Sequence, residues 1–350
     1  MASLGVSIQS SVLALVLVVS AACATRAGSI TTNDSPVANL ADGRTGAIAF
    51  EALTPKNSRD LVSGKASEKS AIAGVLTLPE SVAAAGAPKA KVPAMVVVHG
   101  SSGALQNGWD WAKRLNEMGV ATFVIDNFTG RGVKETATDQ SRLSPAADAV
   151  GALAALRLLS THPQIDPKRI GVIGFSRGGS AAINTALEPI RRAVIDDDLR
   201  FAAHVALYPG CGVPYVSAHL DGSPILMLLG GKDDYTPASN CLAYADQLRA
   251  LGAAIQVVVY PNANHAFDSN TAPHFNPRPT TLHNCQGEID LDAGLLTVGT
   301  GGQGTTGKAA AAALKQCTER GVKVGGDPQA REKAPRDIAD FLKPIFSLAQ

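Results

Sequence analysis

A serine set between glycines, at the end of an apolar run, is the feature of this chain that most directly indicates chemistry. Residues 174–178 read GFSRG; they follow the apolar residues 170–173 and precede small, helix-forming residues. A Gly-x-Ser-x-Gly turn between a strand and a helix is typical of a nucleophile held above a sheet, because the strained turn has no room for bulky neighbours. The pattern predicts that Ser176 attacks a carbonyl carbon, and the alternative is a structural turn with a capping serine.

A serine nucleophile needs a histidine base and an acid that orients the base, and for this kind of turn they follow the serine in the order acid, histidine. Asp233 and Asp234 come after the apolar residues 225–229, and His265 comes after the apolar residues 255–260. Because the carboxyl ends of parallel strands meet at one edge of a sheet, we expect these side chains near Ser176. Of the seven histidines, His265 best combines this order with a strand-end position. The residues alone leave both aspartates open as the acid.

The negative oxygen that forms when a serine attacks a carbonyl needs backbone N–H donors. The amide of Arg177, directly after the serine, is one candidate. The loop after an earlier strand reads HGSSG over residues 99–103, and the amide of Ser101 or of Gly100 is the second candidate. The side chain of Arg177 has two interpretations, a contact with a substrate carboxylate or an ion pair with a neighbouring loop.

The elements that must position these residues alternate between strands and helices. Continuous apolar strands of this kind are typical of a sheet that is covered on both faces. The sequence therefore predicts one α/β domain over residues 46–350, with a mostly parallel central sheet and helices on both faces. Strands are expected at 46–53, 71–78, 92–98, 120–126, 170–174, 202–207, 224–229 and 254–260, and helices at 108–118, 144–160, 178–187, 237–251 and 334–348.

The N-terminus has the pattern of a targeting segment. An apolar core at residues 11–19 is followed by Ala22-Cys23-Ala24, a small-x-small cleavage site, although no Lys or Arg precedes the core. We expect a signal peptide over residues 1–24, a flexible leader over 25–45, and an exported protein, periplasmic or secreted. The alternatives are a lipoprotein anchored through Cys23 and a retained anchor.

Charge gives the chain no marked preference for a charged partner. There are 31 Lys and Arg against 30 Asp and Glu, a formal net charge of +1, which predicts neither nucleic-acid binding nor attraction to an anionic membrane. No later run approaches the roughly 20 apolar residues of a membrane span. The expected partner is a small-molecule substrate, and the sequence specifies no oligomeric state.

Four cysteines remain after the signal peptide: Cys211, Cys241, Cys285 and Cys317. An even number in an exported protein predicts disulfides, with three possible pairings, and buried free thiols are the alternative. The chain has no close Cys-x-x-Cys pair, so neither a zinc site nor a thiol-redox function is favoured.

A glycine-rich stretch over residues 299–309, GTGGQGTTGKA, imitates two nucleotide-binding motifs. Ala309 stands where a phosphate loop needs Ser or Thr, and no strand–helix–strand context supports a dinucleotide site. We expect a flexible surface loop there, and we expect no cofactor and no metal.

In these residues the chain resembles the dienelactone hydrolase family of α/β-hydrolases, from about residue 70 to the C-terminus, with an unfamiliar patch near 285–308. It differs from dienelactone enzymes that use a cysteine nucleophile and a glutamate-bearing loop after the first strand. The chain is more similar to an exported branch of this family that uses a serine nucleophile. The segments that carry it are residues 98–100, 126–132, the turn around Ser176, residues 208–211, Asp233 with Thr236, Pro237 and Cys241, and residues 264–267.

The resemblance implies an α/β-hydrolase fold without a large lid, in which a glycine-rich insertion at about 274–308 forms one wall of the pocket. In the family the catalytic acid stands four residues before a proline, which favours Asp233 over Asp234 because Pro237 follows it at that spacing. The family likeness also implies a disulfide between Cys211 and Cys241, and hence one between Cys285 and Cys317.

The sequence thus predicts a serine hydrolase that cleaves carboxylic esters or lactones through an acyl-enzyme. Ser176, His265 and Asp233 are the expected triad, and the amides of Ser101 and Arg177 are the expected oxyanion donors. The alternative is a catalytically silent α/β-hydrolase-fold binding protein of the cell envelope.

Overall fold

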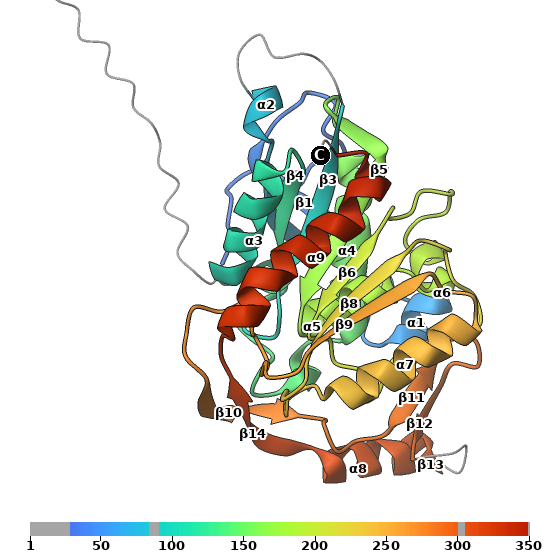
Figure 1. Ribbon diagram of the computed structural model, residues 1–350. Coiled ribbons are helices and arrows are strands. Elements are labelled where there is room, and N and C mark those ends of the chain that lie inside the picture. The colour runs from blue at the N-terminus through green and yellow to red at the C-terminus, as the bar shows by residue number, and fades with distance from the viewer. Residues whose placement is uncertain (1–28, 84–90, 105, 300–304, 349–350) are drawn as a thin grey trace, which may run out of the picture.

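A sheet of eight strands runs through the part of the chain that the computed structural model describes, residues 29–83, 91–104, 106–299 and 305–348 (Figure 1). Neighbours from β4 to β9 are parallel, whereas β2 is antiparallel to both β1 and β4. This mostly parallel sheet confirms the predicted α/β architecture. In spatial order the strands are β1 (Gly46–Leu53), β2 (Lys69–Thr77), β4 (Ala121–Asp126), β3 (Val92–Val98), β5 (Ile165–Phe175), β6 (His204–Leu207), β8 (Ile225–Gly230) and β9 (Ile255–Tyr260).

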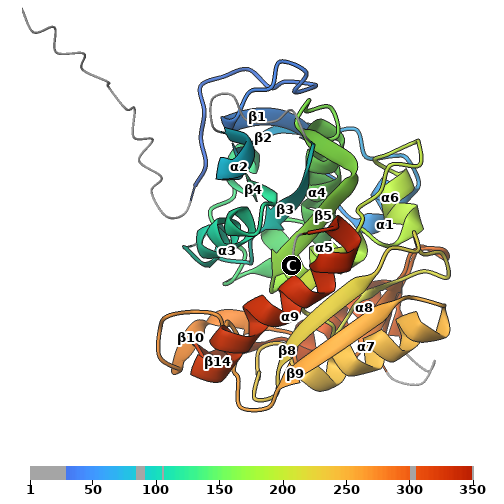
Figure 2. The same cartoon turned by 45° about the horizontal axis from the view of Figure 1, so that its top comes forward.

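Helices cover both faces of the sheet, as Figure 2 shows from a second direction. Side chains of β3 alternate between the two apolar cores. Val96 belongs to the core that includes residues of α4, α5 and α7, and Val97 belongs to the core that includes residues of α3 and α9. The helices are α1 (Ser58–Val62), α2 (Glu80–Ala83), α3 (Gln106–Glu117), α4 (Pro145–Leu159), α5 (Arg177–Asn184), α6 (Glu188–Arg192), α7 (Ala238–Ala250), α8 (Gly307–Cys317) and α9 (Pro328–Phe346), with 3-10 turns η1 (Thr129–Arg131) and η2 (Gln140–Arg142).

Helix boundaries follow capping residues. Ser144 accepts a hydrogen bond from the amide of Ala146 and Pro145 occupies the first turn, so α4 begins where the sequence predicts. Helix α9 begins six residues before the predicted start, at Pro328, because the Asp327 side chain caps it by accepting from the amide of Ala330.

Residues 25–45 were expected to form a flexible leader. The described part of this segment packs on the domain instead, which corrects that expectation. Leu40 is fully buried, and its amide donates to the hydroxyl of Thr161. The amide of Ile30 donates to the carboxylate of Asp126 at 2.9 Å. Apolar side chains spaced among the polar ones therefore anchor residues 29–45. The predicted signal peptide, residues 1–24, lies outside the described residues.

The insertion is larger and more ordered than the predicted glycine-rich loop. It follows β9 and forms two small sheets with α8, on the lower side of the view in Figure 1. Residues 300–304 lie outside the described residues, but residues 307–309 begin α8, which corrects the predicted loop. The strands are β10 (His274–Thr281) with β14 (Glu319–Val324), and β13 (Thr305–Thr306), β12 (Leu295–Val298), β11 (Gly287–Asp290) with β7 (Tyr215–Val216).

Two disulfides each join a loop residue to a helix residue, in α7 and in α8. Cys211 and Cys241 lie at bonding distance, as do Cys285 and Cys317, in the pairing that the family likeness implies. None of the helices in the described ranges has the length and apolar character needed to cross a bilayer.

Candidate active site

Ser176 occupies a strained turn between β5 and α5. Its φ of 53° and ψ of −117° lie outside the conformations that side-chain-bearing residues normally adopt. The flanking glycines are required by close backbone contacts. A methyl group on Gly174 would lie 2.0 Å from the carbonyl oxygen of Gly178, and one on Gly178 would lie 2.3 Å from the carbonyl oxygen of Val98. These contacts explain the glycine spacing and leave the Ser176 side chain partly exposed above the carboxyl end of the sheet.

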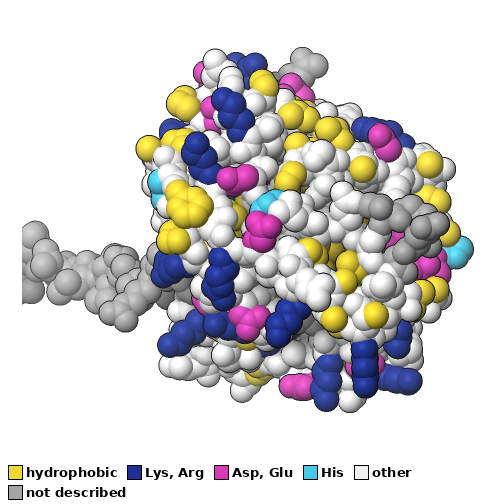
Figure 3. All heavy atoms as spheres, turned by 90° about the horizontal axis from the view of Figure 1, so that it is seen from below, with side chains coloured by type: hydrophobic (Ala, Val, Ile, Leu, Met, Phe, Trp, Pro, Cys, Tyr) yellow, Lys and Arg dark blue, Asp and Glu magenta, His cyan; other side chains and the backbone are white. Residues whose placement is uncertain are grey.

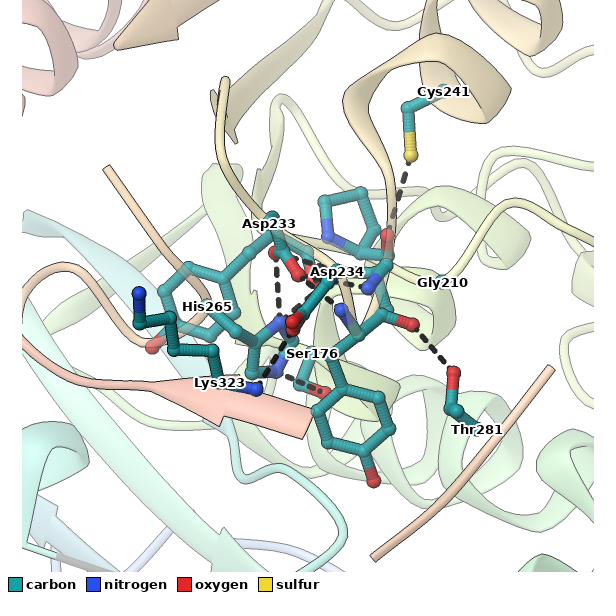
Figure 4. A network of polar contacts seen from close by, with 12 residues as sticks. Ser176, Gly210, Asp233, Asp234, Cys241, His265, Thr281 and Lys323 are labelled. Atoms are coloured by element: carbon teal, nitrogen blue, oxygen red, sulfur yellow. Dashed lines mark hydrogen bonds and ion pairs between the residues drawn. The ribbon is translucent and has the colours of Figure 1, made fainter. Parts of the chain in front are cut away.

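Three predicted side chains meet at this point, as Figure 4 shows. His265 Nε2 lies 3.0 Å from Ser176 Oγ, and His265 Nδ1 lies 2.8 Å from Asp233 Oδ2. An ionised carboxylate can only accept, so the proton sits on Nδ1 and the lone pair of Nε2 faces the serine hydroxyl. His265 and Asp233 are buried, at 4% and 6% exposure, which shields their contact from competing water.

The loop after β8 holds the Asp233 carboxylate in place. Backbone amides of Tyr235 and Thr236 donate to Asp233 Oδ1 at 2.9 and 2.8 Å, and the Thr236 hydroxyl donates to Oδ2 at 2.9 Å. Asp234, the other candidate acid, points to a different element. Its Oδ1 accepts from the backbone amide of Lys323 in β14 at 2.7 Å.

Two aromatic rings enclose the imidazole of His265. The ring centroids of Tyr208 and Tyr235 lie 4.7 and 4.6 Å from its centroid. The Tyr208 hydroxyl donates to the carboxyl group of Asp268 at 2.7 Å, and Trp111 Nε1 donates to the same group at 2.8 Å. Burial raises the pKa of Asp268, an effect that the hydrogen bonds from Tyr208 and Trp111 only partly offset.

The predicted oxyanion loop passes directly beside the serine. A methyl group on Gly100 would lie 3.4 Å from Ser176 Cβ. The carbonyl oxygen of Gly100 accepts from His99 Nδ1 at 2.8 Å and from the amide of Gly103 at 3.1 Å. These two bonds fix the peptide plane that also carries the Ser101 amide. Arg177 opens α5, where a backbone amide has no acceptor within its own helix.

The side chain of Arg177 forms an ion pair, which decides between its two interpretations. Its Nε lies 2.6 Å from Asp148 Oδ2 in α4, and Nη2 donates to the carbonyl of Leu143 at 2.6 Å. Nη1 donates to the side chain of Gln140, which in turn contacts the Ser101 hydroxyl. The guanidinium is therefore buried beneath the site and unavailable to a substrate carboxylate.

Several neighbours of the triad had no role assigned from the sequence. Tyr208 and Thr236 lie in segments that carry the family resemblance, which is the one feature of the sequence that could have placed them near the triad. Asp268 and Gln140 come into place through contacts that no local pattern reveals.

No cluster of three or more His, Cys, Asp or Glu side chains in the described ranges could hold a metal ion. A cavity of about 690 Å³ lies near the starts of β8 and β9, lined by residues that include Glu188, His219 and Asp221. It lies at the amino ends of these strands, whereas Ser176 lies at the carboxyl end of the sheet, and no triad residue lines it.

Comparisons with known proteins agree with this architecture. The pattern of the Dienelactone hydrolase family matches residues 81–286. A protein of Methylorubrum extorquens, provisionally named carboxymethylenebutenolidase, is 27% identical over 216 residues, which cover 59% of this chain and 72% of the relative. A protein of the same provisional name in Yersinia pestis is 30% identical over 112 residues, 32% of this chain and 42% of that one.

Solved structures show the same fold at low identity. An alpha/beta hydrolase enzyme from a Medee basin deep-sea metagenome library is 15% identical with a TM-score of 0.51, covering 87% of this chain and 100% of its own. A dienelactone hydrolase-like promiscuous phosphotriesterase from metagenomic libraries is 17% identical with a TM-score of 0.50, covering 86% and 99%. These likenesses confirm the α/β-hydrolase fold. With the family pattern spanning more than half of its length, the chain belongs to the dienelactone hydrolase family and is a hydrolase acting on esters or lactones.

Proposed function

We propose that the protein is a serine hydrolase that cleaves carboxylic esters or lactones through an acyl-enzyme. Ser176 is the nucleophile, His265 is the general base and acid, and Asp233 orients the imidazole. The observation that carries the proposal is the hydrogen-bonded chain from Ser176 Oγ to His265 Nε2 at 3.0 Å and from Nδ1 to Asp233 at 2.8 Å. Nucleophile, base and orienting acid stand within the reach that acyl transfer requires.

Each proton in this mechanism passes through His265 Nε2. The Ser176 hydroxyl gives its proton to Nε2 while Oγ bonds to the carbonyl carbon, and the carbonyl oxygen becomes negative. Collapse of this intermediate expels the alcohol, which takes the proton from Nε2. Water then attacks the acyl-enzyme, again losing a proton to Nε2. The acid product forms as the bond to Ser176 Oγ breaks, and Oγ takes the proton back from Nε2. With a lactone, both products are parts of one hydroxy acid.

We place the oxyanion between the amides of Ser101 and Arg177. The peptide before Ser101 is fixed by the two hydrogen bonds to the Gly100 carbonyl. The amide of Arg177 lies at the N-terminus of α5, where the partial positive charge of the helix favours a negative oxygen. Preorganised donors of this kind are worth about 2.7–4 kcal/mol each in other serine hydrolases.

We also propose export to the periplasm or the medium. The two disulfides support this, because such bonds persist in oxidising compartments. The N-terminal sequence of protein recovered from cells should begin directly after Ala24. A lipid-bearing Cys23 at the mature N-terminus would replace this proposal by a lipoprotein.

Turnover of p-nitrophenyl acetate with stopped-flow detection tests the mechanism. An acyl-enzyme predicts a burst of p-nitrophenolate close to one equivalent of active protein, followed by a slower steady state. Ser176→Ala should lose both phases while keeping its melting transition. Ser239→Ala, at an exposed position on α7, is the matched control and should keep both. Unchanged turnover in folded Ser176→Ala would refute the assignment.

A further inference from the structure

The last strand of the insertion lies against the loop between β9 and β10 that carries His265, which we call the histidine loop. We call the pair β10 (His274–Thr281) and β14 (Glu319–Val324) the ribbon. Val324 forms a parallel bridge with His265, and the amide of Gly325 donates to the carbonyl of His265 at 2.9 Å. Two residues on, the amide of Asp327 donates to the carbonyl of Phe267 at 2.9 Å. The backbone that carries the imidazole is therefore held by the chain that returns from the insertion.

Both strands of the ribbon also bind the loop between β8 and α7 that carries Asp233, which we call the acid loop. From β14, the amide of Lys323 donates to Asp234 Oδ1 at 2.7 Å, and from β10, the hydroxyl of Thr281 donates to the carbonyl of Tyr235 at 2.9 Å. In Figure 4, Lys323 and Thr281 lie on opposite sides of the view, with Asp234 between them. Asp233 directly precedes these two contacts in the chain.

The ribbon also forms a hydrogen bond to a third loop near the site, the one that precedes Gln140. The amide of Thr280 donates to the carbonyl of Ala137 at 2.8 Å. Three residues further on, the Gln140 side chain contacts the hydroxyl of Ser101 in the oxyanion loop. The ribbon thus bonds to the acid loop, to the histidine loop and to the loop that supports the oxyanion donors.

The second disulfide lies close to one end of the ribbon. Cys285 follows the end of β10 by four residues, and Cys317 precedes the start of β14 by two. The bond between them closes the excursion through β11, β12, β13 and α8 at the base of the ribbon. On the face that the insertion forms, seen in Figure 3, hydrophobic, basic and acidic side chains are interspersed.

We propose that the ribbon is a positioning element of the active site and that Asp234 is a positioning residue, acting through the amide of Lys323. The inference rests on the proposed triad. Two adjacent aspartates then have separate tasks: Asp233 orients the imidazole, while Asp234 attaches the acid loop to the strand that holds His265. The loop with Asp233 connects β8 to α7, and the loop with His265 connects β9 to β10. A catalytic group displaced by 1 Å can lose about 100-fold in rate.

Two substitutions at Asp234 separate the effect of its hydrogen bond on turnover from the effect of its charge. Asp234→Ala and Asp234→Asn both remove the carboxylate charge, but only asparagine keeps an oxygen that can accept from Lys323. We expect Asp234→Ala to lower kcat about tenfold with KM within about twofold, and Asp234→Asn to restore most of kcat. Equal losses in both variants, or no loss in Asp234→Ala, would overturn the proposal.

A second variant keeps the test decisive if Asp234→Ala fails to fold. Cys285→Ser/Cys317→Ser frees the base of the ribbon without touching any triad contact. It should lower kcat in the same direction, and wild-type kcat in this folded double variant would overturn the proposal. The reaction of wild-type Ser176 with a fluorophosphonate is measured alongside. Absent labelling would contradict the triad itself, whereas normal labelling with unaffected variants would contradict only the role of the ribbon.

Discussion

Tyr208 holds its ring 4.7 Å from the imidazole of His265, while its hydroxyl donates to the buried carboxyl group of Asp268 at 2.7 Å. Tyr208 has a φ of 40°, a conformation that costs on the order of 1–3 kcal/mol for a residue with a side chain. Asn107 and Trp111 add hydrogen bonds to the same cluster. These hydrogen bonds hold the hydroxyl end of the Tyr208 side chain, so that its ring stays beside the imidazole of His265.

The raised pKa of Asp268 predicts a pH-dependent stability. Because burial raises this pKa, the folded protein retains the proton to higher pH than the unfolded chain, in which Asp titrates near 3.9. The free energy of unfolding therefore falls as pH rises from that value through the folded pKa. Asp268→Asn lacks this proton, so its stability should decline less over the same range. Urea denaturation at a series of pH values checks this, and parallel curves for the two proteins would contradict it.

The close contacts of Gly178 predict a severe effect of a single methyl group. Gly178→Ala would place Cβ 2.3–2.4 Å from the carbonyl oxygens of Val98 and His99, and it should destabilise the protein by about 3 kcal/mol. Gly108→Ala is the control, because its Cβ would lie 3.8 Å from the nearest side chain, inside α3. It should stabilise by about 0.4–1 kcal/mol. Equal melting temperatures for the two variants would be incompatible with the contacts described.

The hydroxyl of Thr236 predicts a separable contribution to turnover. It lies 2.9 Å from Asp233 Oδ2 and 3.0 Å from His265 Nδ1. Thr236→Val keeps the shape of the side chain but removes a hydrogen bond to a charged group, and it should lower kcat about tenfold. Thr236→Ser retains the hydroxyl and should stay within about threefold of wild type. Steady-state kinetics of the folded variants would show whether valine and serine differ as expected.

The buried pair of Arg177 and Asp148 predicts non-additive stability changes. Their side chains are 6% and 1% exposed, so Arg177→Met leaves a buried, unpaired carboxylate and should cost about 3–5 kcal/mol. Arg177→Met/Asp148→Leu removes both charges and should be more stable than the single variant. A double-mutant cycle by urea denaturation measures this coupling. A double variant that is less stable than Arg177→Met would contradict it.

The central sheet could be predicted because its strands are continuous apolar runs, of which β3 is the clearest. The insertion could not. Strands β11 and β12 are four residues long, and β11 pairs with β7, more than 70 residues earlier in the chain, so their formation depends on distant partners. Helix α8 did have a signal, since residues 309–313 are five successive alanines, but the preceding glycines favoured a loop.

Within the site, the predictable residues are those that end strands. Ser176, Asp233 and His265 follow β5, β8 and β9, and chain order alone brings them to one edge of the sheet. Asp234 could not be assigned a task before its contact with Lys323 was known, because that contact joins positions 89 residues apart.

Labelling of the mature protein with a fluorophosphonate, followed by peptide mass mapping, tests the central claim most directly. We expect one phosphonyl group per chain, on Ser176, with labelling lost in His265→Ala and retained in His219→Ala, a control at an exposed position far from the triad. Absence of labelling in the folded wild-type protein, or labelling that persists unchanged in His265→Ala, would contradict an activated serine at this site.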